Sequence, residues 1–209
     1  MFTAEQDAAH AVSKCTGIYV CDLAPGISDT DLWQLMSTWG RIAAFERINH
    51  TADEALIVEF DAWESAKEAR HTLNFTCIRG KTSRCLLRSD IKTIKSTMLN
   101  GNRLYMDNLD PALESRGFSD ACCIFGHVLD CKIELDTNGK SCGYGFVHYA
   151  TLEDAQKATK HLHGMQIGAK EVQVRPFSYE DSKAFTGCHY STHINRELSA
   201  NAPAFSMPS

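Results

Sequence analysis

The sequence predicts an α+β protein built from two small βαββαβ domains in tandem, followed by a disordered tail. The chain contains an internal repeat, both copies show the same order of strand-like and helix-like hydrophobic patterns, and this periodicity stops after Phe177. A chain of 209 residues with 44% hydrophobic residues can bury a core in each of two small domains.

The repeat has a period of about 88 residues. Residues 18–23 (IYVCDL) reappear as 104–109 (LYMDNL). A helical pattern also occurs twice, as Ala66, Ala69 and Leu73 and again as Ala155, Ala158 and Leu162. The two copies therefore predict two domains of the same fold.

The first copy covers residues 16–90 and begins with an apolar strand at 17–22. A helix follows, because Leu32, Leu35, Met36 and Trp39 are spaced i, i+3, i+4, i+7. Ser28 and Asp31 form its capping box, and Gly40 ends it. We expect two strands, a helix and a strand at 42–48, 54–60, 63–74 and 83–87.

The second copy covers residues 102–177 and predicts the same elements. A strand at 103–107 precedes a helix that contains Phe118, Ala121, Cys122 and Phe125. The strands at 128–135 and 143–149 are joined by an Asn138-Gly139 turn. Thr151 and Asp154 cap the second helix, and 170–175 is the closing strand. This is the split βαβ, ferredoxin-like plan, with two helices behind a four-stranded antiparallel sheet.

Three further segments connect or flank the domains. Residues 1–15 are expected to be flexible, 91–101 to be a polar linker, and 178–209 to be a disordered tail. Because no apolar run approaches ~20 residues and the first residues are acidic, we expect no membrane segment and a cytoplasmic location, with the nucleus as the alternative.

The nine cysteines contain no Cys-x-x-Cys pair of the kind that zinc sites use. We interpret them as reduced thiols. Cys188, His189 and His193 in the tail could be read as a metal cluster, but they lack a fourth ligand and fit a flexible tail better. The sequence therefore predicts neither a metal nor another cofactor.

We also expect no enzymatic activity. No nucleophile, base and orienting group, and no phosphate-binding loop, stand out. Four histidines on predicted elements are interpreted as surface or packing residues: His127, His148, His161 and His163.

Aromatic residues gather on one face of the second predicted sheet. Residues 142–149 (CGYGFVHY) fit an eight-residue RNA-binding strand pattern at every position except the first. Strand alternation places Tyr144 and Phe146 on the same face, and Tyr105 on the neighbouring strand completes a group of three rings that we expect to face solvent.

Exposed rings of this kind stack on unpaired bases, each worth ~1 to 3 kcal/mol, and the flanking glycines are expected to let nucleic acid approach closely. Cys142 stands where the pattern has a basic residue, and Lys140 is expected to replace it. The net charge of −5 argues against a non-specific polyanion binder. The alternative interpretation of the rings is a half-buried β surface.

The first copy lacks this group. Its matching residues are 53–60, where Ala55 and Ile57 occupy the stacking positions and Asp53 and Glu54 the basic and glycine positions. Only Tyr19 remains as a ring, so a structural or protein-binding role is favoured over strong RNA binding.

Over residues 17–177 the pair resembles the first two RNA-recognition motifs of the cytoplasmic poly(A)-binding protein family, the second half more closely. The resemblance is carried by residues 19–23, 73–75, 78–81, 108–110 and 143–148. It implies binding of poly(A) or A-rich single-stranded RNA, with Asn108 among the binding residues, and contact between the helical side of the second motif and translation initiation factors.

The tail carries a second resemblance. Residues 198–208 are similar to the peptide motif by which proteins dock on the C-terminal domain of poly(A)-binding protein. The matching residues are Leu198, Asn201, Ala202 and Phe205, and Pro208 follows Phe205 by three residues instead of the usual two. The alternative is an inert tail.

Together these patterns predict a cytoplasmic adaptor that binds single-stranded mRNA and docks on poly(A)-binding protein, in translation or mRNA stability. The alternative is a protein-interaction scaffold of the translation machinery whose domains no longer bind RNA.

Overall fold

The computed structural model describes residues 16–49, 54–136, 138–178 and 181. The predicted N-terminal segment 1–15 and the tail motif at 198–208 lie outside these residues. The described chain divides into two compact units, and the boundary falls between Ile91 and Lys92.

Each unit contains a four-stranded antiparallel sheet, which confirms the predicted plan. The first sheet has the order β2-β3-β1-β6 and the second the order β8-β9-β7-β12. The two orders place corresponding strands of the two copies at corresponding positions.

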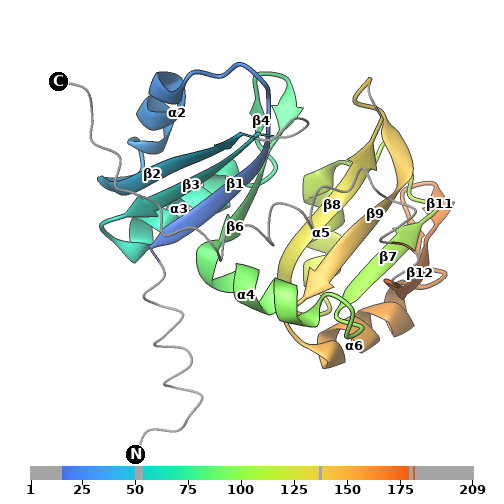
Figure 1. Cartoon of the computed structure of the whole chain (residues 1–209). Helices are drawn as coiled ribbons and strands as arrows, with labels where there is room; N and C mark the ends of the chain where they lie inside the picture. The colour runs from blue at the N-terminus through green and yellow to red at the C-terminus, as the bar shows by residue number, and fades with distance from the viewer. Residues whose placement is uncertain (1–15, 50–53, 137, 179–180, 182–209) are drawn as a thin grey trace, which may run out of the picture. The chain divides into compact units, whose positions relative to one another are not determined.

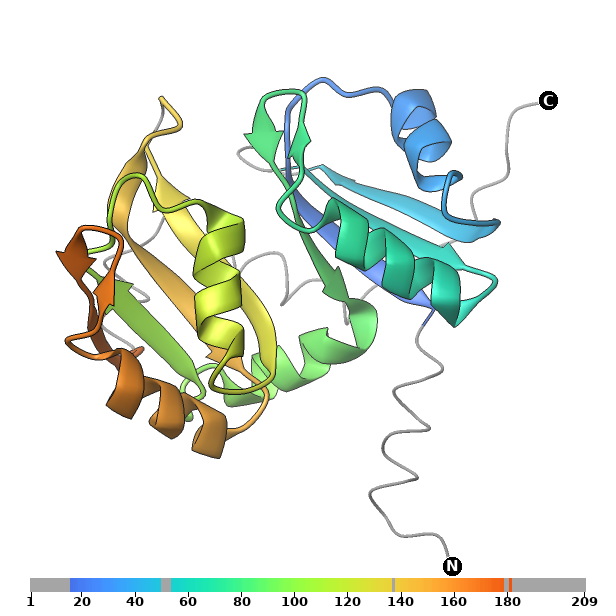
Figure 2. The same ribbon diagram turned by 180° about the vertical axis from the view of Figure 1, so that it is seen from behind.

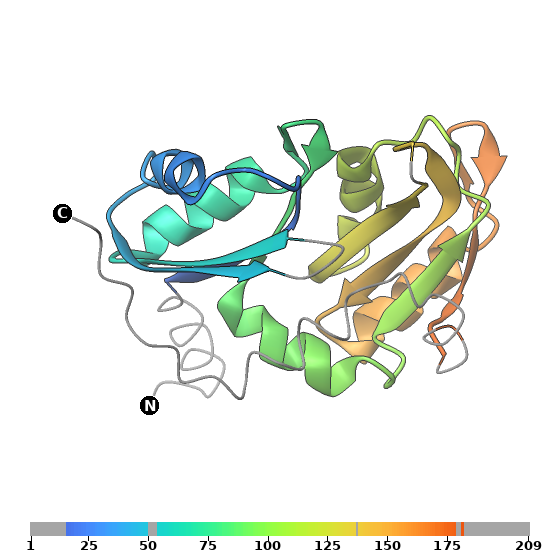
Figure 3. The same ribbon diagram turned by 45° about the horizontal axis from the view of Figure 1, so that its top comes forward.

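The first domain begins at β1 (Figure 1). Its elements are β1 (Gly17–Leu23), α2 (Asp29–Met36), β2 (Ile42–Asn49), β3 (Glu54–Phe60), α3 (Trp63–Leu73), β4 (Cys77–Ile78), β5 (Lys81–Thr82) and β6 (Arg84–Leu87). Figure 3 shows α2 and α3 on the same side of this sheet, so its other face is free of helices from its own domain.

The second domain repeats this arrangement after one additional helix. The additional helix is α4 (Arg88–Thr97), and the boundary between the two units falls within it. The elements that follow are β7 (Arg103–Asp107), α5 (Ser115–Cys123), β8 (Val128–Leu135), β9 (Ser141–Tyr149), α6 (Leu152–Leu162), β10 (Gln166–Ile167), β11 (Lys170–Glu171) and β12 (Gln173–Pro176). Figure 2 shows α5 and α6 side by side on one face of the second sheet.

Both predicted caps are present. The Ser28 hydroxyl accepts a hydrogen bond from the backbone amide of Asp31, and the Thr151 hydroxyl accepts one from that of Asp154, each at 3.1 Å. Each cap satisfies a backbone N–H group that has no partner within the first turn of the helix.

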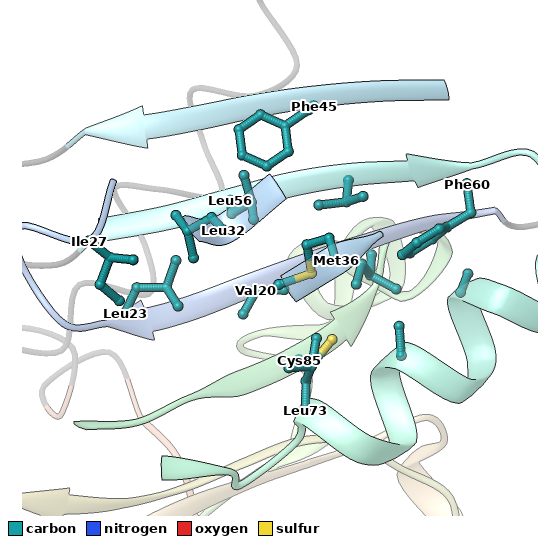
Figure 4. Close-up of a cluster of buried hydrophobic side chains, with 14 of the residues drawn as sticks. Val20, Leu23, Ile27, Leu32, Met36, Phe45, Leu56, Phe60, Leu73 and Cys85 are labelled. Carbon is teal, nitrogen blue, oxygen red and sulfur yellow. The ribbon is translucent and has the colours of Figure 1, made fainter. Parts of the chain in front are cut away.

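The first core lies between the sheet and its two helices (Figure 4). Leu32 and Met36 lie four residues apart on α2 and are completely buried against β-strand residues such as Leu56. The spacing that predicted this helix from the sequence is therefore the spacing that fills the core.

Two predicted boundaries differ from the structure. Much of the segment predicted as a polar linker at 91–101 belongs to α4, where Ile91 and Ile94 are buried on one face of the helix. The closing strand begins at Gln173, later than predicted, because Lys170 and Glu171 pair with β10 in a separate hairpin. The first domain has the corresponding hairpin in β4 and β5.

Across the described part of the chain, no helix has the length and apolar character needed to cross a membrane. Within the same residues, no group of His, Cys, Asp or Glu side chains could hold a metal ion. The seven cysteines that the structure describes are free thiols. Cys188, His189 and His193 lie outside the described residues.

Candidate nucleic-acid interface

The helix-free face of the second sheet is defined by strand alternation. Tyr149 points toward the helices, since its hydroxyl donates a hydrogen bond of 2.9 Å to the carbonyl oxygen of Cys122 on α5. Tyr144 and Phe146 therefore lie on the opposite face. Tyr105 pairs directly with Phe146 across β7 and β9, and Lys132 on β8 pairs with Phe146 from the other side.

The structure brings the three predicted rings together. The ring centroids are 5.7 Å apart for Tyr105 and Tyr144, 5.7 Å for Tyr105 and Phe146, and 6.0 Å for Tyr144 and Phe146. We call these three side chains the ring group. Contacts at this range match the preferred separations of aromatic pairs, so the rings support one another as one apolar surface.

The three rings differ in accessibility. Phe146 is only 2% exposed and Tyr105 8% exposed, while Tyr144 is half-buried. Phe177 packs edge-on against Phe146 with 5.4 Å between centroids, and the Arg103 guanidinium lies 4.5 Å from the Phe146 ring centroid. The expectation that all three rings face solvent is therefore wrong for Phe146 and Tyr105, which are buried, and only Tyr144 is partly accessible.

Burial and a neighbouring carboxylate keep the Tyr105 hydroxyl protonated. Burial of the ring and the negative charge of Asp107 raise the pKa of Tyr105. The phenol therefore stays protonated at neutral pH.

One end of this face is closed by α4. His148 pairs with Arg103 on β7 and with Asp130 on β8, and it is 2% exposed. Its Nε2 atom lies 2.8 Å from the Thr97 hydroxyl of α4. Burial and the positive charge of Arg103 lower the pKa of His148 to about 4, although Asp130 acts in the opposite direction. His148 is thus a packing residue, one of the two roles that the sequence allowed.

Two predicted RNA-binding residues stand apart from the rings. Lys140 is exposed in the turn before β9, and its backbone amide donates to the Asp136 carboxylate at 2.8 Å. The Asn108 side chain donates to the carbonyl oxygen of Glu171 at 2.8 Å. Asn108 thus connects the end of β7 to β11, and it has a φ of 57°, a left-handed conformation that asparagine tolerates.

Gly145 lies between Tyr144 and Phe146 on β9, at a position where the neighbouring strand leaves no room for a side chain. A Cβ atom on Gly145 would lie 2.5 Å from the carbonyl oxygen of Lys132, closer than such atoms approach. Gly145 therefore allows β8 to pair closely with β9. The predicted role of Gly145 in the approach of nucleic acid stays a prediction.

The first sheet confirms the predicted correspondence between the copies. Tyr19 pairs with Ile57 as Tyr105 pairs with Phe146, so an aliphatic side chain occupies the place of the central ring. Tyr19 is 3% exposed and Ala55 is buried. The Glu54 carboxylate forms an ion pair with Arg47, whereas Asp53 lies outside the described residues.

Sequence analysis missed four residues of the second domain that surround the ring group: Arg103, Arg175, Phe177 and Asp181. The Arg175 guanidinium lies 4.3 Å from the Tyr105 ring centroid. Arg103 and Arg175 alternate with core residues on strands next to the rings, a signal that could have identified them. No comparable local signal exists for Asp181.

Comparison with known proteins agrees with this geometry. The RNA recognition motif matches residues 18–84 and 104–173. Over 207 residues the chain is 31% identical to the polyadenylate-binding protein, cytoplasmic and nuclear, of Chaetomium globosum, an alignment that covers 93% of this chain. The chain spans only 26% of the length of that relative.

Two solved structures are also similar in fold. The Sex-lethal protein–RNA complex gives a TM-score of 0.47 at 21% identity and covers 78% of this chain and 100% of its own. The first two domains of yeast poly(U)-binding protein Pub1 give a TM-score of 0.36 at 21% identity, with 78% and 99% covered.

The first matched segment contains Tyr19 on β1 and the neighbouring strand β3. The second contains β7 and β9, the two strands that carry the ring group. With two matched motifs over most of the described residues, the chain belongs to the RNA recognition motif family.

Proposed function

We propose that the second domain binds single-stranded RNA on the ring group. The observation that carries this proposal is the mutual contact of Tyr105, Tyr144 and Phe146 on the helix-free face of the sheet. Unpaired bases stack on such rings whatever their sequence, and Tyr144 is the most accessible of the three. With a net charge of −5 on the chain, stacking supplies most of the affinity.

The first domain has a supporting role in this proposal. Ile57 and Ala55 offer no aromatic surface, and Tyr19, the ring that remains, is buried. The first domain is thus a structural or protein-binding module, and RNA binding is concentrated in the second domain.

The wider function is that of a cytoplasmic adaptor in translation or mRNA stability, with A-rich RNA as the favoured ligand. The poly(A)-binding relative supports the choice of RNA. The tail motif at Leu198, Asn201, Ala202, Phe205 and Pro208 supplies the link to the C-terminal domain of poly(A)-binding protein, and initiation factors are further candidate partners. Tethering of this kind raises a modest RNA affinity through effective concentration.

Tyr144→Ala should weaken RNA binding by ~1 to 3 kcal/mol, because it removes the most accessible stacking ring. Binding of the full chain to labelled oligoadenylate and to a mixed-sequence oligonucleotide measures the loss. Tyr144→Phe, which keeps the ring, is the matched control and should bind nearly as well as the wild type.

If neither RNA binds the wild-type chain, or if Tyr144→Ala binds as tightly as Tyr144→Phe, the ring group is not the binding surface. That result would favour the scaffold alternative. The substitution of aliphatic residues for rings in the first sheet is the observation that already favours a scaffold role for that domain.

Phe205→Ala should reduce recovery of poly(A)-binding protein by about thirtyfold, since truncation of a large buried anchor costs ~2 kcal/mol or more. Pull-down from nuclease-treated extract measures it, because nuclease removes RNA that could bridge the proteins. The oligoadenylate affinity of the variant should be unchanged. Equal recovery with both chains would show that the tail is not the docking motif.

A further inference from the structure

Arg175 occupies a position where a ligand of the ring group would meet it. It pairs with Tyr105 across β12 and β7, and its guanidinium lies 4.3 Å from the centroid of that ring. The side chain remains about half exposed. It is therefore a cation on the edge of the proposed stacking surface, a position suited to a phosphate group of a stacked nucleotide.

In the free protein this cation is bound by Asp181. Both carboxylate oxygens of Asp181 accept hydrogen bonds of 2.6 Å from the two terminal nitrogens of Arg175. The Arg175 guanidinium accordingly lowers the pKa of Asp181 well below its usual range, and Asp181 is only 7% exposed. A two-pronged pair of this type has the same geometry as a guanidinium bound to phosphate.

Ser178 holds the Asp181 carboxylate in place. Its backbone amide and its hydroxyl both donate to one oxygen of Asp181 at 2.7 Å, and the hydroxyl accepts a bond of 3.3 Å from the Asp181 amide. This is a reciprocal capping arrangement, so the position of Asp181 depends on several bonds. The predicted disordered tail at 178–209 therefore begins with an ordered contact.

The same part of the chain covers a second ring. Phe177 packs on Phe146, and the Arg103 guanidinium lies 4.3 Å from the centroid of Phe177. We call Phe177, Ser178 and Asp181 the strap residues. The Phe177 ring packs on Phe146, where the base of a bound nucleotide would stack. The Asp181 carboxylate binds Arg175, where the phosphate of that nucleotide would bind.

We propose that Arg175 is a phosphate-binding residue of the RNA surface, and that Asp181 fills its anion site until RNA replaces it. The proposal rests on RNA binding by the ring group. RNA binding then exchanges one anion for another at Arg175, and the measured affinity is the intrinsic affinity reduced by the cost of releasing Asp181.

Asp181→Asn should raise the RNA affinity of the full chain by about fivefold, because it removes the competing charge while keeping the side-chain size. The dependence of log affinity on log salt concentration should steepen by about 0.7, the value for one additional phosphate contact on a single strand. Asp120→Asn is the matched control, since it removes the same charge from an exposed position on α5.

Two further variants separate competition from a change in fold. Ser178→Ala removes a hydrogen bond that holds Asp181 and changes no charge. It should also raise the RNA affinity, by a smaller factor than Asp181→Asn. Arg175→Ala should weaken RNA binding more in the Asp181→Asn background than in the wild type. In the wild type the loss is smaller, because RNA no longer has to displace Asp181 from Arg175.

The outcomes distinguish this proposal from the proposed function. If Asp181→Asn and Asp120→Asn raise the affinity equally, or if Asp181→Asn lowers it, competition at Arg175 is overturned while RNA binding stands. If the wild type binds no RNA and Asp181→Asn does, competition is supported in its strongest form. If neither binds RNA, both proposals are overturned.

Discussion

Phe146→Ala should lower the free energy of unfolding of the second domain by about 3 kcal/mol, the cost typical of removing a buried phenylalanine side chain. Phe146 is 2% exposed and contacts Tyr105, Tyr144, Phe177 and the Arg103 guanidinium. Its substitution therefore opens a cavity, so Phe146 contributes to the stability of the domain as well as to the proposed binding surface.

Chemical denaturation of the full chain can assign this loss to the correct domain. All three tryptophans, Trp33, Trp39 and Trp63, lie in the first domain, so their fluorescence should report an unchanged transition. Far-UV circular dichroism should show the second domain unfolding earlier. Tyr144→Ala, two residues away on the same face, should cost about 1 kcal/mol or less because Tyr144 is half-buried. Equal losses for the two variants would contradict the structure.

The second domain should also lose stability as the pH falls from about 6.5 toward about 4, by about 3 kcal/mol in total. The buried His148 ring is held neutral, and its pKa in the folded domain is lowered to about 4. The unfolded chain therefore takes up a proton at a higher pH than the folded chain does. The stabilisation is complete above the unfolded pKa and is lost on acidification.

His148→Gln isolates this contribution from the carboxylates that titrate in the lower part of the range. The glutamine side chain can still bond to the Thr97 hydroxyl but has no ionisable group. The measured quantity is the difference in unfolding free energy between wild type and variant at pH 7 and at pH 4.5. A difference that does not change with pH would show that His148 is not held neutral by burial.

The fold was predictable because its signals are local. Ser28 and Thr151 begin helices at the predicted positions, and the alternation in β9 separates Tyr144 and Phe146 from the core residues Val147 and Tyr149. These patterns depend on neighbours within a few positions in the chain. The same alternation correctly grouped the three rings on one face.

The surroundings of that face were not predictable in the same way. Alternation shows which side of a sheet a ring occupies, but not which distant residues cover it. Phe177 follows β12 and Thr97 lies on α4, and their contacts with this face arise only when the sheet is assembled. The helix α4 was missed for a related reason, since Ile91 and Ile94 are too few to establish a helical period.

Glu54 makes the difference between the two domains hard to reverse by single mutations. It stands where the second domain has Gly143, and its carboxylate forms an ion pair with Arg47, whose side chain is 14% exposed. A change to glycine alone would remove one of the two carboxylates that bind Arg47, leaving Asp29. Glu54→Gly would thus destabilise the first domain and would not by itself add an aromatic ring to the sheet. The residue that takes the place of Gly143 in the first domain is therefore part of an ion pair on which that domain's stability depends.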